Sequence, residues 1–178
     1  MATTGLSGKL LIFLMVLASG CALHRGINGN GSATTPHTGT HSAKKAEQKL
    51  RYDITQFARK HVGTKYRYGG KAPTGFDCSG FTTYVMREFE IPVSGPSYSQ
   101  ESLGRKIKKE EARPGDLVFF RKSRAGKVFH VAIVYDNDHE GMSLIHSTSS
   151  RGVVIDNVEK SSYWRSKVMT VRDVVSGK

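Results

Sequence analysis

The sequence predicts an α+β domain in which N-terminal helices pack on an antiparallel β-sheet. In the first half of the ordered region, apolar residues recur at three- and four-residue steps, as in helices that place one face on a core. After the turn Arg113-Pro114-Gly115-Asp116, the pattern changes to short β-branched and aromatic runs between polar breaks. Because these breaks are short, neighbouring strands are expected to be antiparallel. Helices followed by a meandering sheet are typical of the α+β class.

Three helices are expected before the turn. The second follows Asp77, whose side-chain oxygen can accept from the unpaired N–H groups of a first helical turn. Phe81, Val85 and Phe89 then give this helix an apolar stripe. The expected helices run from Ser42 or Ala43 to Gly63, from Asp77 to the residue before Ile91-Pro92, and from Pro96 to about Leu103 with Ser97 as a candidate cap.

Five strands are expected after the turn. Residues 44–178 contain no internal repeat and are predicted to form one domain. The expected strands are Leu117–Arg121, Val128–Tyr135, Ser143–His146, Val153–Val158 and Val168–Val174.

The N-terminal segment predicts export. Residues 1–20 contain one lysine, a compact apolar run and small residues at their end, as in a signal peptide. The small residues before Cys21 resemble a bacterial lipobox, which implies a lipid-modified Cys21; the alternative is an ordinary secretory signal. By resemblance to enterobacterial lipoproteins, Ala22 after the cysteine favours the outer membrane. Residues 21–43 are polar and glycine-rich and are expected to be a flexible tether.

The charge balance limits the class of partner. Lys and Arg number 27 against 15 Asp and Glu, a formal net charge of +12. Such a surplus suits anionic surroundings such as lipid headgroups or a cell envelope, although a solvated basic surface explains it equally well. No dense basic block is interleaved with aromatic residues, so nucleic-acid binding is not expected.

Cys78 is the first candidate for chemistry. It follows the predicted cap Asp77, in the first turn of a helix, where exposed N–H groups and the helix dipole favour thiolate over thiol. A thiolate attacks carbonyl carbon, so Cys78 is a candidate nucleophile. The alternative is a small apolar residue that only fills the core.

Two histidines lie on predicted strands and suit the same chemistry. Both faces of the strand around His130 are apolar, so its imidazole needs a partner, and His146 on the next strand can supply one. Cys78 would attack, His130 would accept its proton, and His146 would orient His130. The alternatives are satisfied core histidines or a zinc site, although no Cys-x-x-Cys or His-Glu-x-x-His pair is present.

Several motifs carry a family resemblance. The motifs are Tyr66-Arg67-Tyr68-Gly69-Gly70, Phe76-Asp77-Cys78-Ser79-Gly80-Phe81, Pro114-Gly115-Asp116-Leu117-Val118-Phe119-Phe120 and His130-Val131-Ala132-Ile133. Together they resemble the NlpC family of bacterial cell-wall cysteine peptidases. His146-Ser147-Thr148-Ser149-Ser150, Val153-Val154-Ile155 and Tyr163-Trp164 are similar to the Spr (MepS) lipoproteins within that family. The resemblance implies a papain-like fold and cleavage of peptidoglycan stem peptides.

The resemblance also implies roles for individual residues. Cys78 matches the nucleophile, His130 the base and His146 the third polar residue. Tyr66 matches a tyrosine whose hydroxyl helps to hold the oxyanion, a choice that the residues alone do not make over Tyr68.

Two further residues and the reaction complete the expectations. Asp77 and Ser79 flank the nucleophile and are candidate substrate contacts, with helix capping as the alternative. The resemblance favours hydrolysis of D-alanyl–diaminopimelate cross-links; the alternatives are the γ-D-glutamyl–diaminopimelate bond and a non-catalytic wall-binding lipoprotein. The chain is expected to be a monomer without cofactor or metal, held on the outer membrane by Cys21 and facing the periplasm.

Overall fold

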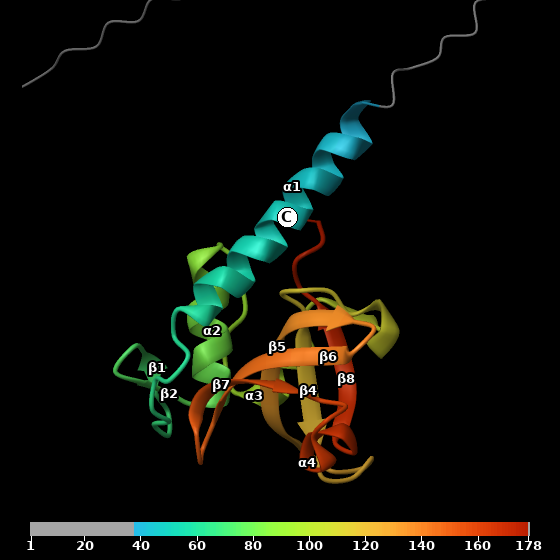
Figure 1. The fold of residues 1–178 in the computed structure, drawn as a ribbon. Helices are drawn as coiled ribbons and strands as arrows, with labels where there is room; N and C mark the ends of the chain where they lie inside the picture. The colour runs from blue at the N-terminus through green and yellow to red at the C-terminus, as the bar shows by residue number, and fades with distance from the viewer. Residues whose placement is uncertain (1–37, 178) are drawn as a thin grey trace, which may run out of the picture. The chain divides into compact units, whose positions relative to one another are not determined.

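The structure is a computed structural model that describes residues 38–177 (Figure 1). The predicted signal peptide, the lipidation site Cys21 and most of the predicted tether lie outside these residues. The helices are α1 (Thr38–Arg59), α2 (Cys78–Glu88), α3 (Ser97–Gln100), η1 (Lys109–Glu111, a 3-10 turn) and α4 (Ser162–Arg165). The strands are β1 (Lys71–Ala72), β2 (Gly75–Phe76), β3 (Arg105–Ile107), β4 (Leu117–Arg121), β5 (Val128–Asp138), β6 (Gly141–Thr148), β7 (Gly152–Asn157) and β8 (Val168–Asp173).

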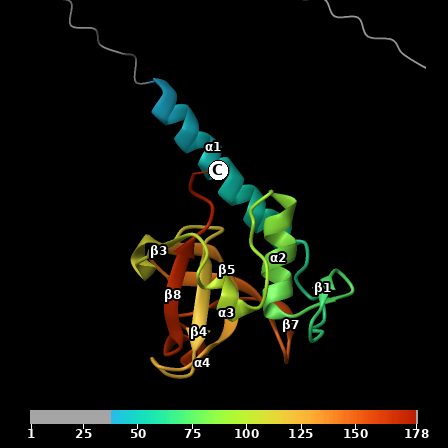
Figure 2. The same cartoon turned by 180° about the vertical axis from the view of Figure 1, so that it is seen from behind.

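Six of the strands form one antiparallel sheet in the order β3-β8-β4-β5-β6-β7. Strands β4 to β7 are a meander, and the last strand, β8, returns to pair with β4 (Figure 2). The five predicted strands are all present and antiparallel, and the predicted α+β class is confirmed.

Both faces of the central strands are buried, as predicted for the strand that carries His130. Side chains alternate, so that Val131 and Ile133 of β5 join the core cluster under α2. Ala132 and Val134 join a second cluster on the other face, which includes Trp164 of α4. The sheet is therefore a wall between two apolar layers.

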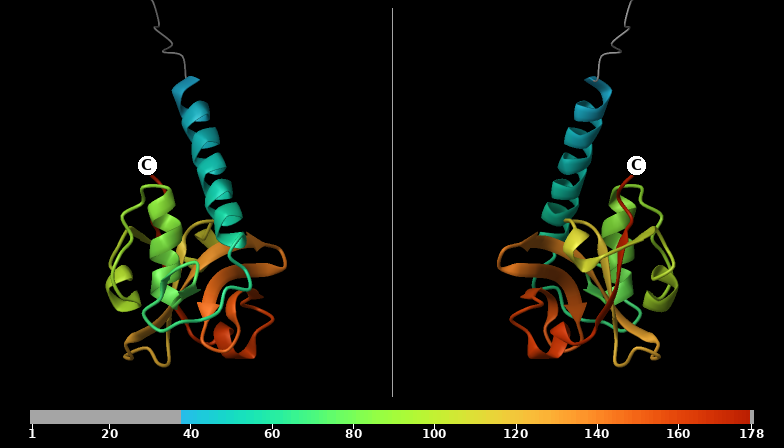
Figure 3. Two further views of the ribbon diagram at one scale, coloured as in Figure 1. Left: turned by 90° about the vertical axis from the view of Figure 1, so that its left-hand side faces the viewer. Right: turned by 90° about the vertical axis from the view of Figure 1, so that its right-hand side faces the viewer.

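Helix α2 packs against the middle of the sheet, over β5 and β6 (Figure 3). Its N-cap is Asp77, whose side chain accepts from the N–H of Gly80 at 2.6 Å, as the sequence predicts. Phe81 and Val85 of the predicted stripe are fully buried, and Phe89 packs at the edge of the same cluster. This packing fixes the N-terminus of α2, where Cys78 lies.

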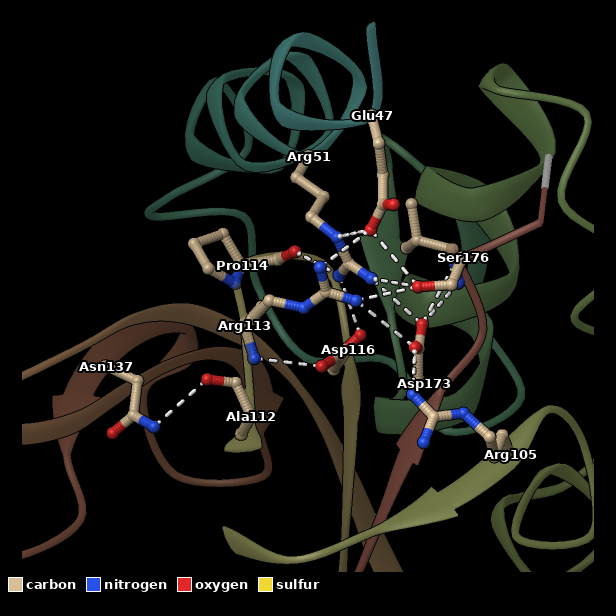
Figure 4. A network of polar contacts seen from close by, with 11 residues as sticks. Glu47, Arg51, Arg105, Ala112, Arg113, Pro114, Asp116, Asn137, Asp173 and Ser176 are labelled. Atoms are coloured by element: carbon tan, nitrogen blue, oxygen red, sulfur yellow. Dashed lines mark hydrogen bonds and ion pairs between the residues drawn. The ribbon is translucent and has the colours of Figure 1, made fainter. Parts of the chain in front are cut away.

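Helix α1 is tied to the sheet by a buried ion cluster around Arg51 (Figure 4). The guanidinium donates to Asp116 at 2.7 Å and to Asp173 at 2.9 Å, and all three side chains are at most 5% exposed. Burial raises the pKa of Asp116 to about 6 in spite of this ion pair. No helix within residues 38–177 is long and apolar enough to cross a membrane.

The structure differs from the sequence-based expectations at the start of α1, at the cap of α3 and in three short strands. Helix α1 begins at Thr38, inside the predicted tether. The sequence did not reveal this start, because the first turns carry no apolar period. The cap of α3 is Pro96, so the assignment of Ser97 as a cap was wrong. Strand β3 was not predicted, since only Ile107 of its three residues is buried, and the two-residue strands β1 and β2 are too short to show a pattern.

Candidate active site

A cavity of about 560 Å³ is lined by three of the four predicted catalytic residues, Tyr66, Cys78 and His130, and His146 lies behind His130. Its lining comes from the N-terminus of α2, the start of β5, the turn between β6 and β7, and α4. The lining residues are Tyr66, Cys78, Lys122, Phe129, His130, Ser147, Thr148, Ser149, Ser150, Arg151, Ser161, Tyr163 and Trp164. A second hollow of similar volume lies beside α1, but no cysteine or histidine is among its described lining residues. The first cavity is therefore the candidate active site.

Cys78 is the first residue of α2 and is partly buried. The backbone N–H groups of Val131, Ser79 and Cys78 itself donate toward its sulfur, which favours the thiolate. Burial outweighs these donors, and the nearby carboxylate of Asp77 adds to it, so the pKa of the thiol is raised. The donors at the helix N-terminus act in the expected direction, but the sequence does not reveal the desolvation that opposes them.

His130 and His146 form the predicted pair. Nε2 of His130 lies 2.9 Å from Nδ1 of His146, and both side chains are buried. Burial lowers the pKa of His130 well below its ordinary range, and the neighbouring His146 lowers it further. His130 is therefore a neutral imidazole at neutral pH, as a proton acceptor must be.

Asp156 extends the pair, and the sequence analysis missed it. Its Oδ2 lies 3.1 Å from Nε2 of His146, and Arg151 donates to both of its carboxylate oxygens. The hydrogen bond with His146 and then that with Arg151 hold the pKa of Asp156 well below its ordinary range. In the sequence, Asp156 is visible only as an acidic residue on the predicted strand after His146. Its contact with His146 can be inferred only from the β6–β7 register, in which His146 pairs with Val154.

Trp164 covers the imidazole of His130. The two rings are nearly parallel, with centroids 4.7 Å apart and planes at 26°. Trp164 also meets His146 at 5.0 Å and Phe120 at 5.0 Å. This aromatic cover supplies much of the apolar surrounding that keeps the imidazole neutral.

Tyr66, and not Tyr68, faces the cavity. Tyr66 is partly buried, and its pKa is raised by burial and then by the negative charges that Cys78 and Asp77 carry when ionised. Tyr68 is 90% exposed. Of the two tyrosines that the residue pattern left open, only Tyr66 is among the described lining residues of the cavity.

The loop that carries Tyr66 is locked to the start of α2. The N–H of Gly69 donates to Oδ2 of Asp77 at 2.9 Å, and the N–H of Asp77 donates to the carbonyl of Gly70 at 3.0 Å. A Cβ on Gly80 would lie 2.0 Å from that same carbonyl, so only glycine permits the approach. Gly70 and Gly80 therefore allow the Tyr66 loop and the start of α2 to approach each other closely.

Asp77 and Ser79 do not line the cavity among its described residues. Asp77 caps α2 and holds the Tyr66 loop, while the hydroxyl of Ser79 donates to Asp77 at 3.1 Å. These contacts support the capping alternative for both residues.

The described residues also bear on the metal alternative. Within residues 38–177 no group of three or more His, Cys, Asp and Glu side chains is arranged to hold a metal ion. The cavity is lined by a thiol, an imidazole and a phenol, which are groups that can support acyl transfer.

Comparison with known proteins gives relatives whose names are those of endopeptidases and hydrolases. The chain is 39% identical over 116 residues to "Probable endopeptidase NlpC" of Escherichia coli (strain K12), covering 63% of this chain and 70% of that protein. It is 34% identical over 115 residues to "Murein DD-endopeptidase MepS/Murein LD-carboxypeptidase" of the same strain, covering 64% and 57%. It is 35% identical over 125 residues to "Gamma-DL-glutamyl hydrolase" of Bacillus subtilis (strain 168), covering 69% of this chain and only 30% of that protein.

A solved structure and a family model agree with these relatives. An NlpC/P60 family protein from Bacillus cereus has a TM-score of 0.64 and 29% identity, covering 70% of this chain and 40% of that one. The model of the NlpC/P60 family matches residues 63–173, which contain Tyr66, Cys78, His130 and His146. The predicted papain-like fold is confirmed by these neighbours. The chain belongs to the NlpC/P60 family.

Proposed function

We propose that this chain is a cysteine peptidase that hydrolyses stem peptides of peptidoglycan. The observation that carries the proposal is the cavity that Cys78 and His130 share, with His146 hydrogen-bonded behind His130. The name of the relative murein DD-endopeptidase supports a peptide substrate from the cell wall, and the name gamma-DL-glutamyl hydrolase supports hydrolysis of a γ-glutamyl bond.

The geometry supports a sequence of proton and acyl transfers. His130 accepts the thiol proton of Cys78 as the sulfur attacks the substrate carbonyl carbon, since the resting pair is thiol and neutral imidazole. The oxyanion of the tetrahedral intermediate lies near the N–H of Cys78 and the hydroxyl of Tyr66. His130 then returns the proton to the leaving amine, and water, deprotonated by His130, hydrolyses the thioester and restores the thiol.

The bond we favour is the D-alanyl–diaminopimelate cross-link, on the strength of the relative named murein DD-endopeptidase. The Bacillus subtilis relative named gamma-DL-glutamyl hydrolase has nearly the same identity and favours the second candidate, the γ-D-glutamyl–diaminopimelate bond. Both reactions need the same thiol, base and oxyanion donors, so the choice depends on how the stem peptide lies in the cavity.

The proposal includes a place in the cell. The small residues before Cys21 support lipid modification of that cysteine, and several acyl chains anchor a protein to a membrane almost permanently. Ala22 supports the outer membrane, with the catalytic domain facing the periplasm as a monomer. Labelling of wild type and Cys21→Ser with a palmitate analogue tests this, since only the wild type should incorporate the label.

Digestion of purified sacculi tests the activity. Wild type should release muropeptides that Cys78→Ala does not, and Ser102→Ala, a change at an exposed turn just after α3, should match wild type. Loss of cross-linked dimers identifies the DD-endopeptidase, whereas truncated stems identify the γ-D-glutamyl reaction. Iodoacetamide should abolish the activity and a metal chelator should not. Binding of sacculi without any product would favour a non-catalytic wall-binding protein.

A further inference from the structure

We propose that Asp156 and Arg151 are positioning residues that fix the tautomers of both histidines, so that Nδ1 of His130 carries the lone pair that receives the thiol proton. The inference rests on the roles proposed above for Cys78 and His130. It adds two members to the catalytic arrangement, and both come from the β6–β7 hairpin.

The carboxylate of Asp156 determines where the proton of His146 lies. An ionised carboxylate only accepts hydrogen bonds, so the contact of 3.1 Å between Asp156 and Nε2 of His146 places a proton on that nitrogen. Asp156 stays ionised because its pKa is lowered by His146 and Arg151. In the tautomer with one N–H that this contact selects, Nδ1 of His146 is an acceptor.

The same rule applies one residue further along. Nε2 of His130 lies 2.9 Å from the acceptor Nδ1 of His146, so Nε2 of His130 must carry the proton. Its own Nδ1 is then left with the lone pair. Without Asp156, both protons could move to the opposite nitrogens, and Nδ1 of His130 would become a donor that cannot receive a proton from Cys78.

Arg151 holds the carboxylate in place. It donates from Nη1 to Oδ1 of Asp156 at 2.9 Å and from Nη2 to Oδ2, a two-point contact that fixes the plane of the carboxylate. The turn that presents Arg151 is itself constrained, because the hydroxyl of Thr148 accepts from the N–H of Arg151 at 3.2 Å and donates to the carbonyl of Gly152.

The hairpin is also seated against the loop that leads to Tyr66. The N–H of Val153 donates to the carbonyl of Thr64, and the N–H of Gly63 donates to the carbonyl of Val153, both at 2.9 Å. A Cβ on Gly152 would lie 2.2 Å from the carbonyl of Thr64, and the φ of +67° at Gly152 also favours glycine. Arg151 and Asp156 therefore have a rigid support.

Asp156 and Arg151 carry opposite charges and should change the basicity of the histidine pair in opposite directions. The carboxylate of Asp156 makes the imidazole pair more basic, whereas the guanidinium of Arg151 partly cancels that effect. The other titratable groups toward the pair come from three elements: Cys78 of α2, Tyr66 of the preceding loop and Lys122 after β4. Steric damage to the hairpin would shift the pH dependence of Cys78 reactivity in the same direction in variants of either residue. Shifts of opposite sign therefore distinguish a positioning role from a structural one.

The test uses the full chain in detergent, labelled with ¹⁵N-histidine, as wild type, Asp156→Asn, Asp156→Ala and Arg151→Gln. Long-range ¹H–¹⁵N spectra distinguish Nδ1–H from Nε2–H histidine, and His130→Gln and His146→Gln assign the two rings. Glu140→Gln is the matched control, because it breaks an ion pair with Lys160 on the exposed side of the same region. Wild type and Glu140→Gln should show Nε2–H at both rings. The two Asp156 variants should show Nδ1–H in a substantial fraction.

The rate of Cys78 alkylation by iodoacetamide against pH supplies a second readout that needs no peptidoglycan. Its acid limb should move down by about 1 in pH in Asp156→Asn and up in Arg151→Gln, with a plateau lower by roughly 10- to 100-fold in Asp156→Asn. Unchanged tautomers in both Asp156 variants, or acid limbs that move in the same direction, would overturn the proposal. Inactivity of wild type on sacculi would instead reject the proposed function and leave these two readouts valid.

Discussion

The hydroxyl of Ser147 donates a hydrogen bond of 2.7 Å to the backbone carbonyl of Phe76. The donor follows His146 directly on β6, and the acceptor lies two residues before Cys78. This contact is a short connection between the strand that carries the histidine pair and the segment that leads into the nucleophile, and both residues are fully buried.

Replacement of Ser147 by Ala should therefore affect the rate more than the stability. The Phe76 carbonyl keeps a second donor, the N–H of Arg67 at 3.0 Å, so the loss in the free energy of unfolding should be about 1 kcal/mol. We expect kcat on peptidoglycan fragments to fall by roughly 10- to 100-fold, since small displacements of reacting groups are costly. Urea unfolding and steady-state kinetics measure the two effects. Equal loss in the control Ser102→Ala, or none in Ser147→Ala, would contradict the prediction.

The pH profile should reflect the buried base. The pKa of His130 is lowered from its ordinary 6.5, and the neutral imidazole is the reactive form. Activity should then be lost only as the pH falls through this lowered pKa, so kcat/KM should still be near its plateau at pH 6. Because the thiol pKa is raised, the resting enzyme should remain thiol and imidazole across the neutral range. An acid limb centred above 6.5 would show that His130 is not desolvated.

Removal of the aromatic cover should shift that limb. In Trp164→Leu, water should reach the imidazole of His130, and the penalty for charging it should shrink. The pKa of His130 should rise, so kcat/KM should begin to fall at a higher pH than in wild type. Tyr163→Leu, which removes the more exposed neighbouring ring, is the comparison. An acid limb at the wild-type position in Trp164→Leu would argue that other groups desolvate the base.

The ion cluster around Arg51 should matter for stability and not for chemistry. Arg51→Met leaves Asp116 buried without its cation and removes one of the three arginines that pair with Asp173, which should cost about 3–5 kcal/mol of unfolding free energy at neutral pH. The pKa of Asp116 is already raised to about 6, and removal of the cation raises it further. The folded state then binds more protons than the unfolded state, so the deficit should shrink as the pH falls below that pKa.

Urea titrations at pH 5 and pH 7.5 measure this difference. Lys49→Met, which breaks an exposed pair on the same helix, should change stability by less than about 0.5 kcal/mol at either pH. The rate per folded molecule should remain that of wild type in both variants. A deficit in Arg51→Met that is independent of pH would contradict the role of the carboxylates.

Local patterns were sufficient to predict much of the fold and three site residues. Asp77 is recognisable as the N-cap of α2, which predicts that Cys78 lies in the first turn of that helix. Strand alternation indicates that His130 is buried and needs a partner, which His146 on the next strand can supply. These three candidate residues could therefore be predicted without any tertiary information. The family resemblance selected Tyr66, and the cavity supports that selection.

The remaining parts depend on tertiary contacts. Asp156 reaches His146 only through the β6–β7 register, and Trp164 covers His130 only through the docking of a four-residue helix. The state of Cys78 depends on how deeply the sulfur is buried, which no local pattern reports. Asp77 and Ser79 lie beside Cys78 in sequence, but the side chain of Asp77 caps α2 and the hydroxyl of Ser79 donates to Asp77.

The β6–β7 hairpin has a consequence for how such enzymes diversify. His146, Ser147, Arg151 and Asp156 all lie on this one continuous segment, while the nucleophile lies on another. Grafting of this single short stretch would exchange the polar groups behind His130 together, while His130 and its Trp164 cover would stay on β5 and α4 and the cysteine helix would be unchanged.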